Sequence, residues 1–153
     1  KSMFQKKTIM IHRDGFFRGD EISYLKELGE KYGINFQFVE VIKRNVPRLY
    51  NIANQKFLNP EKNQIFYLSD KEAILVNNEV KGTKTANPLR IRVSDSSILN
   101  KALISIMALR MMHFGTTKTP KLPVTISFSD RISGFARRGI KPPNKSGNIP
   151  WWY

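Results

Sequence analysis

Two aspartates in this sequence stand where an acidic side chain could do chemistry. Asp14 follows a short apolar run, Thr8 to Arg13, whose nonpolar residues on both parities are typical of a strand buried on both faces of a sheet. Open α/β sheets place their sites at the C-terminal ends of such strands, and Gly15 lets the backbone turn there. Asp130 comes much later in the chain. Each also has an ordinary interpretation, since Asp before Gly is a common turn former and an exposed Asp often pairs with a neighbouring Arg.

The residue types available restrict any metal site to oxygen ligands. The chain has no cysteine, and its two histidines, His12 and His113, cannot form a zinc cluster by themselves. Carboxylates are hard ligands that suit Mg²⁺ or Mn²⁺. Two acidic groups in a strongly cationic chain therefore suit the task of holding a divalent ion against a phosphodiester.

The first part of the chain predicts a βαβ unit that would position Asp14. After the first strand, Asp20 offers a helix N-cap, apolar residues recur at spacings of three and four, and Gly33 supplies a stop. The segment Asn35 to Ile42 then reads as a second strand. A strand, helix and strand in this order predict a parallel pair, and hence an α/β fold.

The second part predicts further strands and two helices. Segments 63–69 and 72–77 form a predicted hairpin, and Leu89 to Val93 alternates apolar residues with two arginines, as a strand with one buried and one cationic face would. A helix is expected over about 97–114, apolar on nearly all sides and therefore covered by other elements. Segment 122–139 is compatible with a strand or a helix. We expect a helix, with Val124, Phe128, Ile132 and Phe135 on its apolar stripe and Pro123 in its first turn.

Composition indicates one domain with a polyanionic partner. The chain has 153 residues, with 26 Lys and Arg against 12 Asp and Glu, and a formal net charge of +14. Such an excess favours nucleic acid, although a ribosomal-type scaffold protein or a solvated basic surface would also explain it. The longest apolar run, 102–112, is too short to span a bilayer, so we expect a soluble, cytoplasmic protein. Because Lys1 to Lys7 lead almost directly into a strand, we also expect further sequence upstream.

Four segments together resemble the second half of the PIWI domain of a prokaryotic Argonaute. They are, in order, His12-Arg13-Asp14-Gly15, the run IKRNVPRLY from Ile42 to Tyr50, Gly82-Thr83, and Ser129-Asp130-Arg131. The resemblance extends over nearly the whole chain. It implies an RNase H-like fold and makes residues 1–153 the C-terminal part of a PIWI domain, incomplete without upstream sequence.

The resemblance also implies a nuclease that cleaves a target paired to a guide strand. The family has a catalytic tetrad, in which Asp14 matches the third member and Asp130 the fourth, while the first Asp and the Glu would lie upstream. These residues would bind two Mg²⁺ or Mn²⁺ ions, one activating the attacking water and the other stabilising the leaving oxygen. Because the chain holds only half of the ligands, we expect it to be inactive alone.

Other matched residues would hold nucleic acid or a further metal ion. By the resemblance, Lys43, Arg44 and Arg48 contact guide phosphates, as do Thr83 and Lys84 in a Gly-Thr loop. Arg137 and Arg138 correspond to contacts near the guide 5′ phosphate. If Tyr153 is the natural terminus, its carboxylate would reach a metal ion bound with that phosphate.

Three functional hypotheses stay open from the sequence. The first is the guide-dependent endonuclease, and the second is a guided binding module whose tetrad is broken upstream. The third is a basic structural RNA-binding protein, for which Asp14 and Asp130 would be dispensable. Contacts to phosphates do not distinguish ribose from deoxyribose, so guide and target could each be DNA or RNA.

Overall fold

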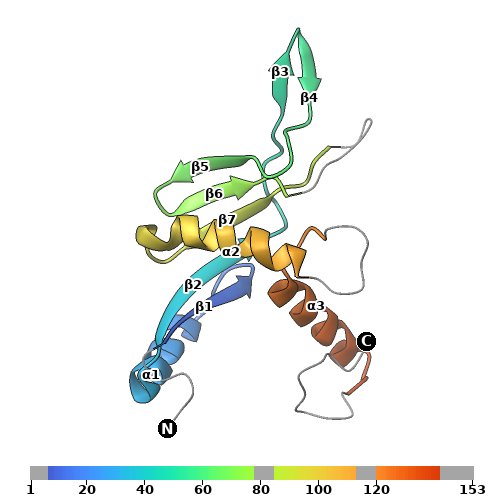
Figure 1. The fold of residues 1–153 in the computed structure, drawn as a ribbon. Coiled ribbons are helices and arrows are strands. Elements are labelled where there is room, and N and C mark those ends of the chain that lie inside the picture. The colour runs from blue at the N-terminus through green and yellow to red at the C-terminus, as the bar shows by residue number, and fades with distance from the viewer. Residues whose placement is uncertain (1–6, 78–84, 113–119, 142–153) are drawn as a thin grey trace.

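The computed structural model describes residues 7–77, 85–112 and 120–141, which form a mixed sheet with helices packed against it (Figure 1). The sheet order is β1-β2-β7-β6-β5, and a separate hairpin pairs β3 with β4. The elements are β1 (Thr8–Asp14), α1 (Glu21–Tyr32), β2 (Asn35–Ile42), β3 (Asn51–Ala53), β4 (Lys56–Leu58), β5 (Ile65–Ser69), β6 (Glu72–Leu75), β7 (Leu89–Val93), the 3₁₀ turn η1 (Ser96–Ile98), α2 (Leu99–Met111) and α3 (Val124–Arg137).

The predicted βαβ unit is confirmed. Strands β1 and β2 pair in parallel, with Thr8 opposite Asn35 and Asp14 opposite Val41. Helix α1 connects them and ends at Gly33, whose φ of 67° lies in the left-handed region that favours glycine. Strands β7, β6 and β5 continue the sheet with antiparallel pairing. The α/β fold class is therefore the one that the sequence predicts.

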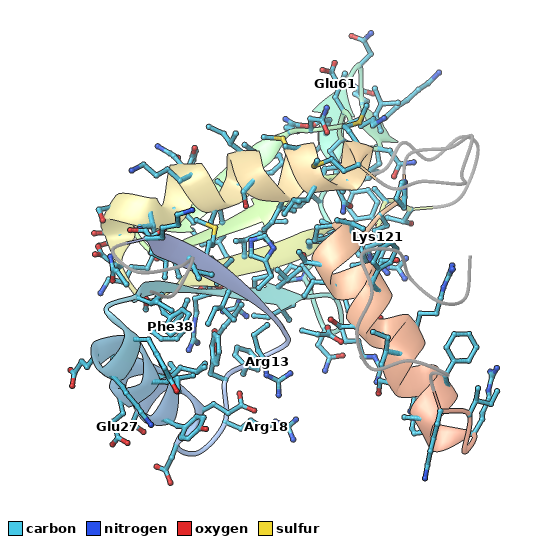
Figure 2. All side chains as sticks on the ribbon, turned by 60° about the horizontal axis from the view of Figure 1, so that its bottom comes forward. Arg13, Arg18, Glu27, Phe38, Glu61 and Lys121 are labelled. Carbon is cyan, nitrogen blue, oxygen red and sulfur yellow. The ribbon has the colours of Figure 1, made fainter. Side chains whose placement is uncertain are left out.

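The two faces of the sheet carry different side chains. On one face, alternate residues of the central strands are fully buried beneath α2, among them Val39, Val41, Leu89 and Ile91. The opposite face bears α1, as Figure 2 shows. Alternation along β7 is as expected, because Leu89, Ile91 and Val93 are buried while the arginines between them are not.

Two expectations about burial are wrong. Strand β1 is half-buried rather than buried on both faces, because in the described part of the chain it lies at the edge of the sheet and pairs with β2 alone. Helix α2 is not covered all round: Ile104 is 63% exposed and Met111 is 73% exposed. Its buried side chains, Ala102, Leu103 and Ile106, form one face, as in a helix that packs on a sheet from one side.

Segment 122–139 is helical, and its packing differs from the predicted stripe. Pro123 is the N-cap of α3 and does not lie in its first turn. Ile126 is the residue buried in the core, whereas Ile132 is 47% exposed. The reason is that only the first turns of α3 contact the sheet and α2, so periodicity further along the helix does not mark a buried face.

Three local features also differ from the pattern-based predictions. Asp20 occupies the N-cap of α1, but its side chain makes no capping bond; its backbone carbonyl accepts from the N–H of Tyr24. The helix expected from 97 begins as the 3₁₀ turn η1. The β3–β4 hairpin, which projects from the sheet in Figure 1, has no counterpart in the predicted elements.

Across the residues described, none of the helices has the length and apolar character to cross a bilayer.

Candidate functional site

Asp14 and Asp130, 116 residues apart in sequence, meet at one ammonium group. The Nζ of Lys43 lies 2.9 Å from Oδ2 of Asp14 and also donates to Oδ2 of Asp130. The side chains are partly covered, with exposed fractions of 31% for Asp14, 42% for Asp130 and 22% for Lys43. The two carboxylates are therefore directed to a common point at the mouth of a cleft.

The strand register explains two of the three positions. Asp14 ends β1 opposite Val41 of β2, and paired residues of parallel strands lie on the same face of a sheet. Lys43 follows Val41 by two residues, so it continues along that face just beyond the strand. This is the face that α2 and α3 cover, and Asp130 reaches it from the second turn of α3.

His12 connects β1 to both of these helices. Its Nδ1 lies 3.0 Å from Oγ1 of Thr125 in α3, and its Nε2 lies 3.1 Å from Oγ of Ser105 in α2. Burial lowers the pKa of His12, which favours the neutral imidazole that can both donate and accept. Because His12 precedes Asp14 by two residues and Thr125 precedes Asp130 by five, these bonds fix the distance between the two aspartates.

Electrostatics favour the ionised forms of Asp130 and Lys43. Burial raises the pKa of Asp130, but hydrogen bonds with Lys43 and Asp14 outweigh it and the net shift is downward. Burial lowers the pKa of Lys43, but its hydrogen bonds to Asp130 and Asp14 outweigh it and the net shift is upward. Two acidic groups at this point are thus stabilised by one shared cation.

The loop after Asp14 is anchored to the sheet by a buried glutamate. Oε1 of Glu40, on β2, accepts from the N–H of Phe17 at 2.8 Å. Its Oε2 lies 2.8 Å from Nε of Arg92 without hydrogen-bond geometry, so this contact is an ion pair. Arg92 in turn stacks over the ring of Phe16 at 5.2 Å. The sequence predicts a cationic face for β7, and the structure pairs that face with Glu40 and Glu72.

Arg13 ties the same loop to the start of α1. Its guanidinium donates to both carboxylate oxygens of Glu21, at 3.0 and 3.2 Å, and to the carbonyl of Asp14 at 2.7 Å. The hydrogen bond from Arg13 lowers the pKa of Glu21. Arg13 therefore fixes the backbone at the C-terminal end of β1, while the Asp14 side chain points to the cleft.

The cleft beside the aspartates has a volume of about 780 Å³ and a largely cationic lining. Six of its lining residues are Arg or Lys and two are Asp, namely Arg13, Arg18, Lys43, Arg44, Arg90, Arg137, Asp14 and Asp130. Its floor is formed by the ends of β1 and β2, and its wall by α3. A cleft of this charge suits an anionic strand, whose phosphates the arginines would neutralise.

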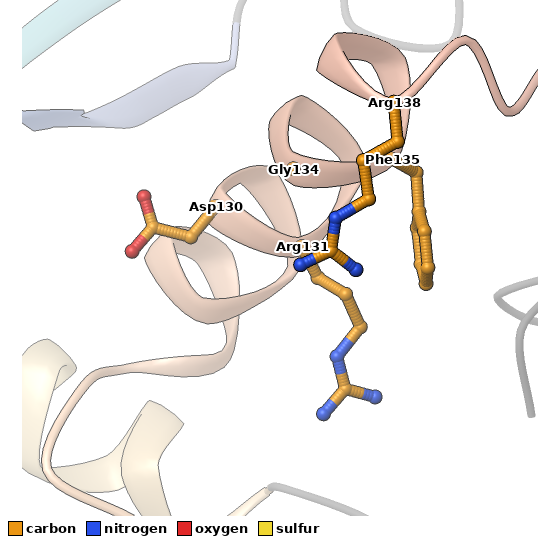
Figure 3. A pocket seen from close by; sticks show the side chains of 5 residues that line it. All are labelled: Asp130, Arg131, Gly134, Phe135 and Arg138. Atoms are coloured by element: carbon orange, nitrogen blue, oxygen red, sulfur yellow. The ribbon is translucent and has the colours of Figure 1, made fainter.

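The structure separates Arg137 and Arg138, which the sequence groups together. Arg137 lies on the same face of α3 as Asp130 and lines the cleft. Arg138 lines a second hollow of about 350 Å³ with Asp130, Arg131, Gly134 and Phe135. In Figure 3 the Asp130 side chain points away from Arg131 and Arg138. Asp130 thus lines both hollows, whereas Asp14 lines the cleft with Arg137 and does not line the hollow of Arg138.

Of the remaining predicted residues that the structure describes, one lines the cleft and the other does not. Arg44 is exposed and lines the cleft, whereas Arg48 is exposed outside it. Five residues singled out in the sequence fall outside the described ones: Gly82, Thr83, Lys84, His113 and Tyr153. Sequence reasoning missed the contacts of Lys43 with both aspartates and the anchoring role of Glu40, although an acidic residue within the apolar run NFQFVEVI is a signal for the latter.

The donor set fits a hard divalent cation but does not complete a site for one. Two carboxylates already share a positive charge at one point, as two ligands of a bound metal would. Within the described parts of the chain, no third acidic residue or histidine joins them in a group able to hold a metal. The pair therefore corresponds to part of a coordination shell.

Comparison with known proteins identifies the family. The protein argonaute of Aquifex aeolicus is 34% identical over 145 residues, which is 94% of this chain and 20% of that protein. A structure of Clostridium butyricum Argonaute bound to a guide DNA and a 19-mer target DNA is 34% identical and superposes with a TM-score of 0.76, covering 88% of this chain and 18% of that one. The chain belongs to the Argonaute family. No protein-family model matches it.

A further Argonaute structure extends the match. Aa-Ago with externally bound siRNA has a TM-score of 0.77 at 33% identity, and covers 99% of this chain and 21% of that one. The chain thus spans about a fifth of the length of the Argonautes it matches. Its mixed sheet with flanking helices is the RNase H-like α/β fold of an Argonaute PIWI domain, as the resemblance implies.

Proposed function

We propose that this chain is the C-terminal part of the PIWI domain of a guide-dependent Argonaute endonuclease. One observation carries the proposal: two carboxylates, far apart in sequence, are directed to one cation at the edge of a basic cleft. The similar proteins support it, since one of them was solved with guide and target DNA and another with siRNA.

In this proposal Asp14 and Asp130 supply two of the ligands of the metal site. Their oxygens would hold Mg²⁺ or Mn²⁺, and the bound ions would supply an activated water and neutralise charge on the phosphodiester. The chain's own residues hold the two carboxylates at a fixed separation through His12, and the hydrogen bond from Lys43 lowers the pKa of Asp130. The other ligands would come from elsewhere in the complete polypeptide.

The cationic residues of the cleft would hold the guide backbone. Arg44 and Arg137 line it and are exposed, and neither forms a salt bridge with another described residue, so both can reach phosphate without giving up an acidic partner. The family correspondence adds Arg48, Thr83, Lys84 and Arg138, with the terminal carboxylate of Tyr153 as a further metal ligand. Sequence would be read by pairing to the guide.

The half-exposed strand β1 supports the proposal that the domain continues upstream. The strand has apolar residues on both faces, and among the described residues one of its edges has no partner strand. Such an edge is suited to pair with a further strand. We therefore expect the 153-residue chain alone to show no metal-dependent cleavage, since two carboxylates do not complete a two-metal site.

The experiment is guided cleavage by the complete polypeptide that contains this chain. Asp14→Asn and Asp130→Asn should each lower the rate of Mn²⁺-dependent cleavage of a paired target by at least about 100-fold, because each removes a direct ligand. Guide binding, measured by filter retention, should stay within a few-fold. Glu27→Gln on α1, an exposed carboxylate away from the cleft, is the matched control.

The same assay separates the alternatives. Cleavage that survives both aspartate substitutions would contradict the proposal. A complete polypeptide that binds a guide but never cleaves would favour a catalytically silent, guided binding module. Nucleic-acid binding that requires no guide and is indifferent to both substitutions would favour a structural RNA-binding protein.

A further inference from the structure

Lys43 stands in the place that a bridging metal would need. Its ammonium contacts Oδ2 of Asp14 and Oδ2 of Asp130. A divalent ion bound to those same oxygens would lie about 2.0 to 2.6 Å from each, within the volume that Nζ now fills. The ammonium and such a metal cannot share this position. One must leave before the other enters.

Several features hold Lys43 in this place. It follows β2 directly, so its backbone is fixed by the central strand, and its side chain is less exposed than either aspartate. Lys121, on the segment before α3, lies close enough to repel it: burial and the charge of Lys43 lower the pKa of Lys121. The carboxylates attract the ammonium, and this second lysine adds a repulsive charge near it.

The neighbouring cations do not share this arrangement. Arg44 is exposed and acts on Asp130 through its charge, whereas the direct ion pair of Asp130 is with Lys43. Arg137 lines the cleft further along α3 and is also exposed. Lys43 is therefore the cation that blocks the two carboxylates, and it is also a residue that faces the cleft where phosphates would lie.

We propose that Lys43 is a displaceable counter-ion, which excludes divalent metal from Asp14 and Asp130 until a backbone phosphate in the cleft draws it away. This inference rests on the proposed function. In the free protein Lys43 neutralises the two aspartates and keeps α3 beside β1. When a phosphate takes the ammonium, the carboxylates are released to bind metal. Phosphate binding and metal binding are then coupled, each strengthening the other by the same factor.

The test is a Mn²⁺ titration of the complete polypeptide, followed by the electron paramagnetic resonance signal of free Mn²⁺. Without nucleic acid, Lys43→Gln should bind Mn²⁺ about tenfold or more tightly than the unaltered protein, because a positive charge in the site is removed. Lys43→Arg should stay near the unaltered affinity, since its guanidinium can bridge the same oxygens. Arg44→Gln removes an equal charge next to the site and should have a smaller effect.

A second arm tests the coupling with a single-stranded oligonucleotide that carries a 5′ hydroxyl, so that no metal ion can bind with a 5′ phosphate. The oligonucleotide should tighten Mn²⁺ binding in the unaltered protein by a factor close to that of Lys43→Gln, and should add little to the variant. Thermal unfolding of each variant shows whether the fold is kept. Only variants whose midpoint temperature of unfolding equals that of the unaltered protein are compared.

The outcomes distinguish the inference from the proposed function. Equal or weaker Mn²⁺ affinity in Lys43→Gln, an effect no larger than that of Arg44→Gln, or full coupling that persists in Lys43→Gln would each overturn the counter-ion role. If Asp14→Asn leaves Mn²⁺ binding in the presence of the oligonucleotide unchanged, then the metal site itself is wrong, and the proposed function fails with it.

Discussion

Glu40 shows how a single buried residue can position a site that it does not touch. It lies near the C-terminal end of β2 with 7% of its surface exposed. One carboxylate oxygen accepts from the backbone of the loop that follows Asp14, and the other pairs with Arg92, which stacks on the same loop. A buried carboxylate is costly unless both oxygens have partners, so its position fixes the loop.

Glu40→Gln should therefore destabilise the protein and loosen the loop. The amide keeps the size of the side chain but turns one acceptor into a donor, which faces either the N–H of Phe17 or the guanidinium of Arg92. We expect the free energy of unfolding to fall by about 1.5 to 3 kcal/mol, the range for a hydrogen bond to a charged group. Urea unfolding measures it.

A control distinguishes positioning from a general change of charge. Glu30→Gln, on the exposed surface of α1, removes the same charge without a buried contact and should change stability by less than about 0.5 kcal/mol. Equal effects of the two substitutions would show that Glu40 does not anchor the loop.

Among the helices, α1 approaches β2 closely because of Gly29. A Cβ added at Gly29 would lie 2.6 Å from the carbonyl oxygen of Ile34 and 3.1 Å from the ring of Phe36. Real Cβ atoms essentially never approach a backbone oxygen so closely, and the oxygen belongs to the chain leading directly into β2. The contact therefore sets how α1 lies on the sheet.

Two glycine substitutions in helices should have opposite signs. Gly29→Ala should lower the free energy of unfolding by about 1 to 3 kcal/mol, since the backbone must shift to admit the methyl group. Gly134→Ala in α3 meets nothing within 4 Å and should raise it by about 0.5 to 1 kcal/mol, because alanine is the better helix former. Chemical denaturation of both variants checks the pair. A stabilising Gly29→Ala would contradict the close approach.

Local sequence predicts the existence of α2 and α3 better than it predicts their packing. Helix α2 forms from a run that is apolar on nearly all sides and α3 from apolar residues at helical spacing, but Ile104 and Ile132 are exposed. The spacing of apolar residues indicates which of them share one side of a helix. It does not indicate how much of that side another element covers. That depends on where the helix crosses the sheet, which local sequence does not encode.

At the scale of the whole molecule, part of the excess positive charge lines a single cleft. The net charge of +14 includes six cationic residues that line one cleft. Fields from like charges add within a cleft and attract a polyanion, and they are screened by salt. Nucleic-acid binding by the complete polypeptide should therefore weaken steeply as salt rises.

The salt dependence can be assigned to individual residues. For a single-stranded guide, Arg137→Gln should reduce the slope of log affinity against log salt by about 0.7, the change expected when one phosphate is no longer neutralised. Lys31→Gln on α1 removes the same charge outside the cleft and should leave the slope unchanged. Fluorescence anisotropy over a salt series measures both slopes. Identical slopes in the two variants would remove Arg137 from the nucleic-acid interface.

Local patterns along the chain were enough to predict the fold class, most of the elements and the two acidic residues that the structure brings together in the candidate site. The information lies in the order of a few neighbouring residues. Alternating apolar residues indicate a strand, and a glycine marks the end of a helix. The residues His12 to Gly15 and Ser129 to Arg131 carry the family resemblance. The parallel pairing of β1 with β2 follows from their order along the chain and is confirmed.

How these parts meet is a matter of tertiary packing. No local pattern states that Lys43 would lie between Asp14 and Asp130, that Arg137 and Arg138 would face different hollows, or that Glu40 would hold a loop. Each of these depends on contacts between segments far apart in sequence. Their geometry is set by sheet register and by the crossing of α3 over β1, and these are properties of the packed chain.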